Sequence, residues 1–208
     1  MIKLEHISKA YGKKLVLDDV SLTIEPGRAI GILGANGSGK STLLSCIVKQ
    51  FAGNKELVMG YVPQENPLFD ELNAVDNLRM WTSKKAFEIR AALDAPPLSA
   101  LGISEYMGIP VSKMSGGMKK RLSIAAALIN HPSLLLMDEP FAALDLVAKH
   151  DILDFMRYYL SQGGSLLVAS HEEALFKLCS KVYLLKNGRL EDTTGKAFDK
   201  EIIELLRN

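Results

Sequence analysis

The stretch Gly-Ala-Asn-Gly-Ser-Gly-Lys-Ser-Thr at residues 34–42 constrains the fold of this chain more than any other feature. It fits the phosphate-loop pattern G-x-x-x-x-G-K-[S/T]. An apolar run at 29–33 precedes it and indicates a buried strand, and residues 42–48 indicate a helix. In that context, glycines let backbone N–H groups and the helix N-terminus face a phosphate. The alternative is a glycine-rich turn that matches by chance, and the flanking strand and helix count against it.

The loop also carries side chains suited to a nucleoside triphosphate and a magnesium ion. We expect Lys40 to reach the β- and γ-phosphates and the Ser41 hydroxyl to bind Mg²⁺. The residues expected to surround the phosphates are Gly34, Asn36, Gly37, Ser38, Gly39, Lys40, Ser41 and Thr42.

Composition bounds the remaining possibilities. A chain of 208 residues with 48% hydrophobic and 24% charged residues is typical of one globular domain, which we take as 1–208. A net charge of +1 gives no sign of a nucleic-acid or membrane-surface partner. Cys46 and Cys179 lack metal-type spacing and indicate core residues in a reducing compartment. Without a signal-peptide profile or a long apolar run, we expect a cytoplasmic protein that reaches a membrane only through a partner.

Alternating strands and helices predict an α/β fold. We expect antiparallel strands at 2–7 and 15–25 and a mostly parallel sheet covered on both faces. The predicted sheet strands are 29–33, 57–62, 134–138 and 165–169, and the predicted helices are 42–50, 118–129, 146–160, 172–178 and 196–206, with a hairpin turn at Asn187-Gly188. In the helix at 118–129, Lys119, Lys120 and Arg121 mark a polar side.

Residues 65–113 have a different character. Prolines punctuate three short helical patterns at 72–81, 84–93 and 99–106, and none of this segment resembles a strand. We therefore expect a helical subdomain at 65–113, inserted into a nucleotide-binding core of 1–64 and 114–208 that includes the antiparallel part.

An acidic pair ends the apolar run at 134–138. Asp138 closes the predicted strand, where a carboxylate can face Mg²⁺ without being buried unpaired. Glu139 follows and is suited to act as the general base that activates water. The alternative is a solvated acidic pair, which a phosphate loop in the same chain makes less attractive.

With these residues in view, the chain resembles an ATP-binding cassette (ABC) ATPase, a P-loop NTPase that serves as the nucleotide-binding subunit of ABC transporters. The resemblance covers essentially the whole chain, and the motifs come in the family's order. Besides the phosphate loop they are Tyr11 as the adenine-stacking aromatic residue, Gln64 as the Q-loop glutamine, Ser115-Gly116-Gly117 as the signature, Leu134 to Glu139 as the Walker B strand, Ala143-Leu144-Asp145 as the D-loop and His171 as the switch histidine.

The resemblance implies roles for these residues. The catalytic group is Glu139, His171, Gln64 and Lys40, and Mg²⁺ is held by Ser41, Gln64 and Asp138. The signature meets ATP bound to the facing subunit, and Asp145 contacts that subunit. Each motif also has an ordinary alternative: Ser115 as a helix N-cap, His171 as an unremarkable histidine, Gln64 as a loop amide and Tyr11 as a turn aromatic.

The implied function is that of an ATP-hydrolysing subunit that pairs around two ATP, with an identical or different second subunit, and drives a transmembrane permease. It would lie on the inner face of the cell membrane through that partner. Residues 73–79 resemble exporter-type cassettes. Candidate permease contacts, with internal packing as an equal alternative, are Phe69, Leu72, Val75, Leu78, Met80 and Trp81.

Two other functions remain open. A non-transport ABC ATPase acting on nucleic acid or ribosomes is disfavoured by the single cassette and the near-zero net charge. An ATP-gated binding module with little turnover is disfavoured by the presence of Glu139 and His171.

The sequence departs from the family pattern in two places. Met118 stands where the family usually has glutamine after the signature, so an amide that could contact the facing nucleotide is lost. Gln64 follows Lys40 by only 24 positions, fewer than the family usually has, so we expect a trimmed antiparallel part.

Overall fold

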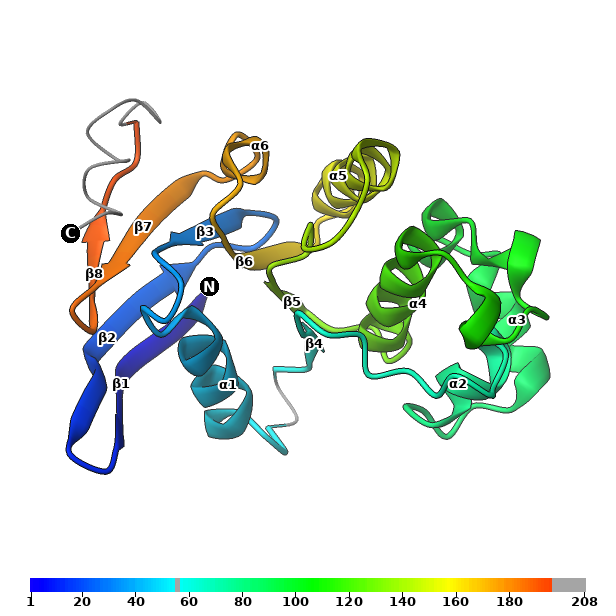
Figure 1. Ribbon diagram of the computed structural model, residues 1–208, viewed down its shortest axis with the longest axis horizontal. Helices are drawn as coiled ribbons and strands as arrows, with labels where there is room; N and C mark the ends of the chain where they lie inside the picture. Colours follow the sequence, from blue (N-terminus) through cyan, green and yellow to red (C-terminus); the bar gives the residue numbers. More distant parts are fainter. Residues whose placement is uncertain (55–56, 196–208) are drawn as a thin grey trace.

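The computed structural model describes residues 1–54 and 57–195, so the helix expected at 196–206 lies outside the described part. A six-stranded sheet in the order β4-β5-β6-β3-β7-β8 runs through the molecule and is parallel except for the β7–β8 hairpin (Figure 1). Its strands are β3 (Ala29–Leu33), β4 (Met59–Val62), β5 (Leu134–Asp138), β6 (Ser165–Ser170), β7 (Lys181–Lys186) and β8 (Arg189–Asp192). The predicted parallel sheet and the hairpin turn at Asn187-Gly188 are confirmed.

One face of this sheet is covered by α1 (Lys40–Gln50) and by an antiparallel pair, β1 (Ile2–Tyr11) and β2 (Lys14–Ile24). Alternation along β5 divides its side chains between the two faces: Leu134 and Leu136 pack with α1, whereas Leu135 and Met137 pack on the other side. Asp138 continues the first set, so the alternation places it on the face that carries α1.

The other face is covered by α5 (Leu146–Ser161), which shares one continuous core with α4 (Gly116–Leu128) and the helical segment. That segment contains α2 (Ala74–Arg79), α3 (Ala86–Leu93) and 3₁₀ turns at Leu98–Leu101, Ile103–Tyr106 and Val111–Lys113, and the short helix α6 (Glu173–Phe176) follows β6. The helical character of 65–113 is confirmed. The single helix predicted at 99–106 is wrong, because Gly102 has φ +63° and divides it into two 3₁₀ turns.

Helix α4 lies directly against β4. A Cβ at Gly60 would be 2.4 Å from the backbone oxygen of Ala127, so only glycine permits this approach. The close packing turns Lys120 inward, on one stripe with Ile124 and Leu128. The prediction that Lys120 belongs to the polar side of the helix is therefore wrong; its side chain is only 1% exposed.

The loop before α2 is held by the buried amide of Asn77. Its Nδ2 donates to the backbone oxygens of Phe69, Leu72 and Asn73, at 3.1, 3.2 and 3.1 Å, and its Oδ1 accepts from Phe69 N at 2.8 Å. Four hydrogen bonds from one side chain satisfy the backbone of a turn that has no regular structure. Phe69 is thereby fixed in position while its ring stays 47% exposed.

The two cysteines are free thiols, both partly buried. Burial raises the pKa of the Cys179 thiol to about 12. A thiol that stays protonated is a poor nucleophile, which fits the predicted core role of this residue.

Candidate nucleotide-binding site

The strand order brings distant motifs to one edge of the sheet. Strands β4, β5, β6 and β3 are neighbours and parallel, so the loops that follow them emerge side by side. In the register, Val62 is opposite Met137 and Leu33 is opposite Ser170. Gln64, Glu139, His171 and the phosphate loop each follow one of these strands. The carboxyl edge of a parallel sheet is where ligands bind in open α/β folds.

A pocket of about 650 Å³ opens at this edge. The predicted site residues that line it are Tyr11, Asn36, Gly37, Gly39, Lys40, Ser41, Thr42, Gln64, Glu139 and His171. Lys14, Val16 and Ala142 also line it and were not singled out from the sequence. A larger pocket of about 680 Å³ lies beside Ser133 and Ser165, where strands begin, at the opposite edge of the sheet.

The phosphate loop has the conformation that its glycines permit. Gly37 and Gly39 have φ of +79° and +108°, and a Cβ at Gly39 would lie 2.9 Å from Val16 Cγ1 on β2. Helix α1 begins without a side-chain cap and without an acidic residue in its first turn. Its first N–H groups are therefore available to an anion, which is the property expected of a phosphate site. The Ser38 Oγ atom is buried behind the loop and has no hydrogen-bond partner in the described part of the chain.

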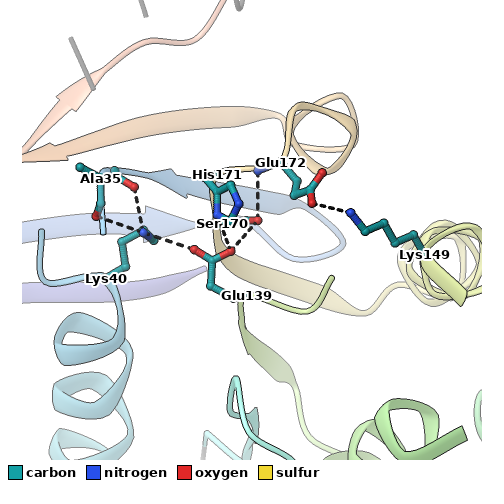
Figure 2. A network of polar contacts seen from close by, with 8 residues as sticks. Ala35, Lys40, Glu139, Lys149, Ser170, His171 and Glu172 are labelled. Atoms are coloured by element: carbon teal, nitrogen blue, oxygen red, sulfur yellow. Dashed lines mark hydrogen bonds and ion pairs between the residues drawn. The ribbon is translucent and has the colours of Figure 1, made fainter. Parts of the chain in front are cut away.

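Lys40 spans the mouth of the loop (Figure 2). Its Nζ donates to the backbone oxygens of Gly34 and Ala35, at 2.8 and 3.3 Å, and lies 3.3 Å from Glu139 Oε1. The Lys40 and Glu139 side chains are only 6% and 9% exposed. A phosphate that binds Lys40 must therefore compete with this ion pair.

Glu139 is also held by two groups at the carboxyl end of β6, Ser170 in the strand and His171 directly after it. The Ser170 hydroxyl donates to Glu139 Oε2 at 3.1 Å, and His171 Nδ1 lies 3.0 Å from the same oxygen. Glu139 has φ +42°, a strained value for a residue other than glycine and one that the surrounding contacts maintain. The carboxylate is thus oriented rather than free. Ser170 was missed as a partner, although its place before His171 at the end of the neighbouring strand could have indicated it.

Asp138 lies beside the pocket, buried to 3% exposure. Its Oδ2 accepts from the Tyr61 hydroxyl at 3.5 Å, and its Oδ1 has no partner among the described residues. Burial raises the pKa of this carboxyl, and the nearby Ser41 hydroxyl opposes the shift. The role expected for Asp138, a carboxylate that faces Mg²⁺, stays a prediction. An unpaired buried carboxylate oxygen near a serine hydroxyl suits a hard cation such as Mg²⁺.

The signature residues lie outside this pocket, at the start of α4. Ser115 is the N-cap of α4, and its Oγ accepts a hydrogen bond from Met118 N at 3.2 Å. Within its own chain, Ser115 therefore acts as the helix cap that was given as the alternative to a phosphate contact. Ser115 and Gly116 remain exposed, and the Met118 side chain packs partly buried against the helical core. Asp145 caps α5 in the same way, accepting from Ala148 N at 2.8 Å.

Tyr11 stands at the rim of the pocket, 59% exposed, at the end of β1. Lys9 Nζ lies 5.2 Å from the centroid of its ring. An exposed aromatic ring at the rim offers a flat surface on which a base can stack.

Comparisons with known proteins agree with this geometry. A family model described as ABC transporter matches residues 17–142. The Nod factor export ATP-binding protein I of Sinorhizobium fredii is 34% identical over 90% of this chain, which spans 61% of the length of that relative. A solved ATP-binding subunit of an ABC transporter is 25% identical, with a TM-score of 0.81 over 98% of both chains. A dimeric bacterial ABC transporter cassette is 26% identical, with a TM-score of 0.77 over 92% of this chain and 97% of the other.

The match to the family model covers more than half of the chain, and the solved cassettes share its fold over nearly their full length. The predicted family and the predicted P-loop fold are thereby confirmed. The chain belongs to the ABC transporter family and is one of its ATP-binding cassettes.

Proposed function

We propose that this chain is the ATP-hydrolysing subunit of an exporter-type ABC transporter and that it pairs around two ATP. The observation that carries the proposal is the placement of Glu139 at the phosphate loop, oriented by Ser170 and His171. The relative named for Nod factor export and the exporter-like residues 73–79 support the exporter type. Action on nucleic acid is not favoured, because the net charge is only +1.

In this proposal the pocket binds ATP along its length. Adenine stacks on Tyr11, and the phosphates contact the N–H groups of the loop and Lys40, which leaves Glu139 as the phosphates arrive. Ser41, Gln64 and Asp138 would hold Mg²⁺, which neutralises charge on the phosphates.

Hydrolysis then depends on Glu139. Its carboxylate accepts a proton from a water molecule that attacks the γ-phosphorus, the bond to the bridging oxygen breaks, and ADP leaves. The Ser170 hydroxyl keeps the carboxylate in place. His171, with a side chain 57% exposed, can turn from Glu139 to donate to the γ-phosphate.

A second copy would complete each site. Ser115 and Gly116 are exposed at the start of α4, whose first turn lacks acidic residues, and they lie outside their own pocket. Two apolar residues follow Asp145, the predicted dimer contact. Leu146 is 82% exposed and Val147 is 71% exposed. An apolar pair this exposed is consistent with a surface that pairing covers. The dimeric cassette of similar fold supports this arrangement.

Pairing can be tested at Gly116. Among the described residues, the nearest atom to a Cβ built there is Leu144 Cδ2 at 3.7 Å, so both Gly116→Ala and Gly116→Asp should fold. An acidic residue also suits the first turn of a helix. In the closed pair, however, a carboxylate would face the partner's γ-phosphate, and like charges in contact cost several kcal/mol. We expect Gly116→Asp to bind ATP normally yet lose ATP-dependent dimers in light scattering, whereas Gly116→Ala keeps them. Equal dimerisation of the two variants would contradict the proposed pairing.

The permease surface is proposed on the helical segment. Of the predicted contacts, Val75 and Leu78 are buried and belong to the core. Phe69, Met80 and Trp81 are 47%, 59% and 44% exposed, and Phe87, which is not among the predicted contacts, is 67% exposed. Among the described residues, every helix is too short or too polar to cross a membrane. We propose that a permease holds the chain on the inner face of the cell membrane through these side chains.

Trp81→Glu tests this surface. The ring is half-exposed at the end of α2, so we expect little change in stability but loss of the chain from membranes that contain its co-expressed permease. Leu15→Glu is the matched control, since Leu15 is 56% exposed on β2. Membrane-bound chain is measured by sedimentation and immunoblot. Retention of Trp81→Glu at the level of Leu15→Glu would remove Trp81 from the interface.

A further inference from the structure

Lys120 is an unusual buried side chain in the part of the chain that the structure describes. It is 1% exposed, and its Nζ donates to the backbone oxygens of Pro63 and Gln64, at 3.2 and 2.9 Å. A buried ammonium is costly, and here desolvation lowers the pKa of Lys120 to about 8. Lys119, its neighbour, has a different environment: its side chain is 29% exposed and lies 3.3 Å from the Asp70 carboxylate.

The two acceptors of Lys120 belong to the loop that leaves β4 for the nucleotide pocket. The Gln64 side chain is exposed and lines that pocket, whereas the Gln64 backbone is tied to α4 through Lys120. The N-cap of the same helix is Ser115, five residues before Lys120, where the proposed second ATP site begins. One cation therefore joins the backbone of Gln64 to the helix that carries the signature.

Filling the space between α4 and β4 would need no charge at this position. Ile124 and Leu128 occupy the same stripe of α4, and apolar side chains fill it against β4. A methionine would fill similar volume but leave both carbonyls without their donor. The ammonium thus links the helix to two carbonyl groups of the loop backbone.

We propose that Lys120 is a positioning residue for ATP hydrolysis: it fixes the Gln64 backbone to α4, so that the Gln64 amide reaches its place at the phosphate end of the pocket only when the signature helix is in place. The inference rests on the proposed ATPase function. Lys120 itself touches no nucleotide and acts through Gln64.

The test uses the full chain and steady-state ATP hydrolysis. We expect Lys120→Met to lower kcat about 10- to 100-fold, because a misplaced catalytic group costs that much, with KM for ATP changed less than about threefold. Lys120→Arg, which can donate to both carbonyls, should restore kcat to within about threefold of the parent. Lys119→Met is the matched control and should behave like the parent.

A double-mutant cycle with Gln64→Ala separates positioning from general damage. If Lys120 acts through Gln64, Lys120→Met should add less than about threefold to the loss caused by Gln64→Ala. Losses that multiply would overturn the proposal, as would a kcat of Lys120→Met equal to that of Lys119→Met. If Lys120→Met does not fold, Lys120→Gln takes its place in the cycle. We then expect a smaller loss of kcat, and this loss should also disappear when Gln64 is already replaced by alanine.

A second measurement does not depend on turnover. Amide hydrogen exchange of the loop after β4, without nucleotide, should increase in Lys120→Met and not in Lys119→Met. Equal amide hydrogen exchange in both variants would contradict the proposed link between Lys120 and the Gln64 backbone. A parent chain that fails to hydrolyse ATP while exchange still separates the two variants would instead overturn the proposed ATPase function.

Discussion

Replacing Glu139 by glutamine is expected to reduce ATP turnover about 10²- to 10⁴-fold, the range that a general base contributes. Glutamine keeps the shape of the side chain and one oxygen for the Ser170 hydroxyl, so the loop at the end of β5 should not move. It cannot take a proton from water, and it holds Lys40 less strongly than the carboxylate at 3.3 Å. Glu139→Gln should therefore bind ATP at least as tightly as the parent and accumulate as an ATP-bound dimer.

Phosphate release and light scattering with ATP measure the two effects on the same samples. Glu172→Gln is the control, because Glu172 is an acidic residue of the same network that pairs with Lys149 at 2.6 Å outside the pocket. Turnover of Glu139→Gln equal to that of Glu172→Gln would remove Glu139 from its role. If Glu139→Gln loses turnover but forms no ATP-dependent dimers, the general-base role of Glu139 stands and the proposed pairing is contradicted.

Strand bounds could be predicted best where the residue type and the hydrophobic pattern change at the same position. The strands at 29–33 and 134–138 have the predicted bounds, because a glycine-rich loop and an acidic pair end their apolar runs. Parallel order then places Gln64, Glu139 and His171 at one edge, and this follows from the alternation of strands and helices. The clustering of these three residues can therefore be predicted from the sequence alone.

The features that the sequence did not disclose depend on tertiary contacts. Lys120 is one of three consecutive basic residues, and its burial depends on how α4 packs against β4, which Gly60 permits. A glycine at position 102 does not by itself predict whether a helix continues through it or is divided there. The Lys40–Glu139 pair joins residues 99 positions apart, and no local pattern encodes such a contact.

Lys40→Met is expected to abolish detectable ATP binding and also to destabilise the nucleotide-free protein. The binding loss follows from the missing cation at the phosphate loop. The stability loss follows from the structure without nucleotide, since Lys40 neutralises a carboxylate that is only 9% exposed. Removing one partner of a buried ion pair typically costs about 3 kcal/mol or more, because the remaining charge stays desolvated. Ser170 and His171 still contact Glu139 and should limit the loss to the lower end of that range.

The double variant Lys40→Met with Glu139→Gln distinguishes these two consequences. A neutral amide needs no counter-charge, so the double variant should regain about 1–2 kcal/mol of the lost stability in urea unfolding. ATP binding should remain lost, because nothing replaces the lysine at the phosphates. Additive stability changes would mean that the ion pair contributes nothing to the stability of the free protein. A positive coupling would mean that the ion pair stabilises the free protein, so that a γ-phosphate has to compete with Glu139 for Lys40.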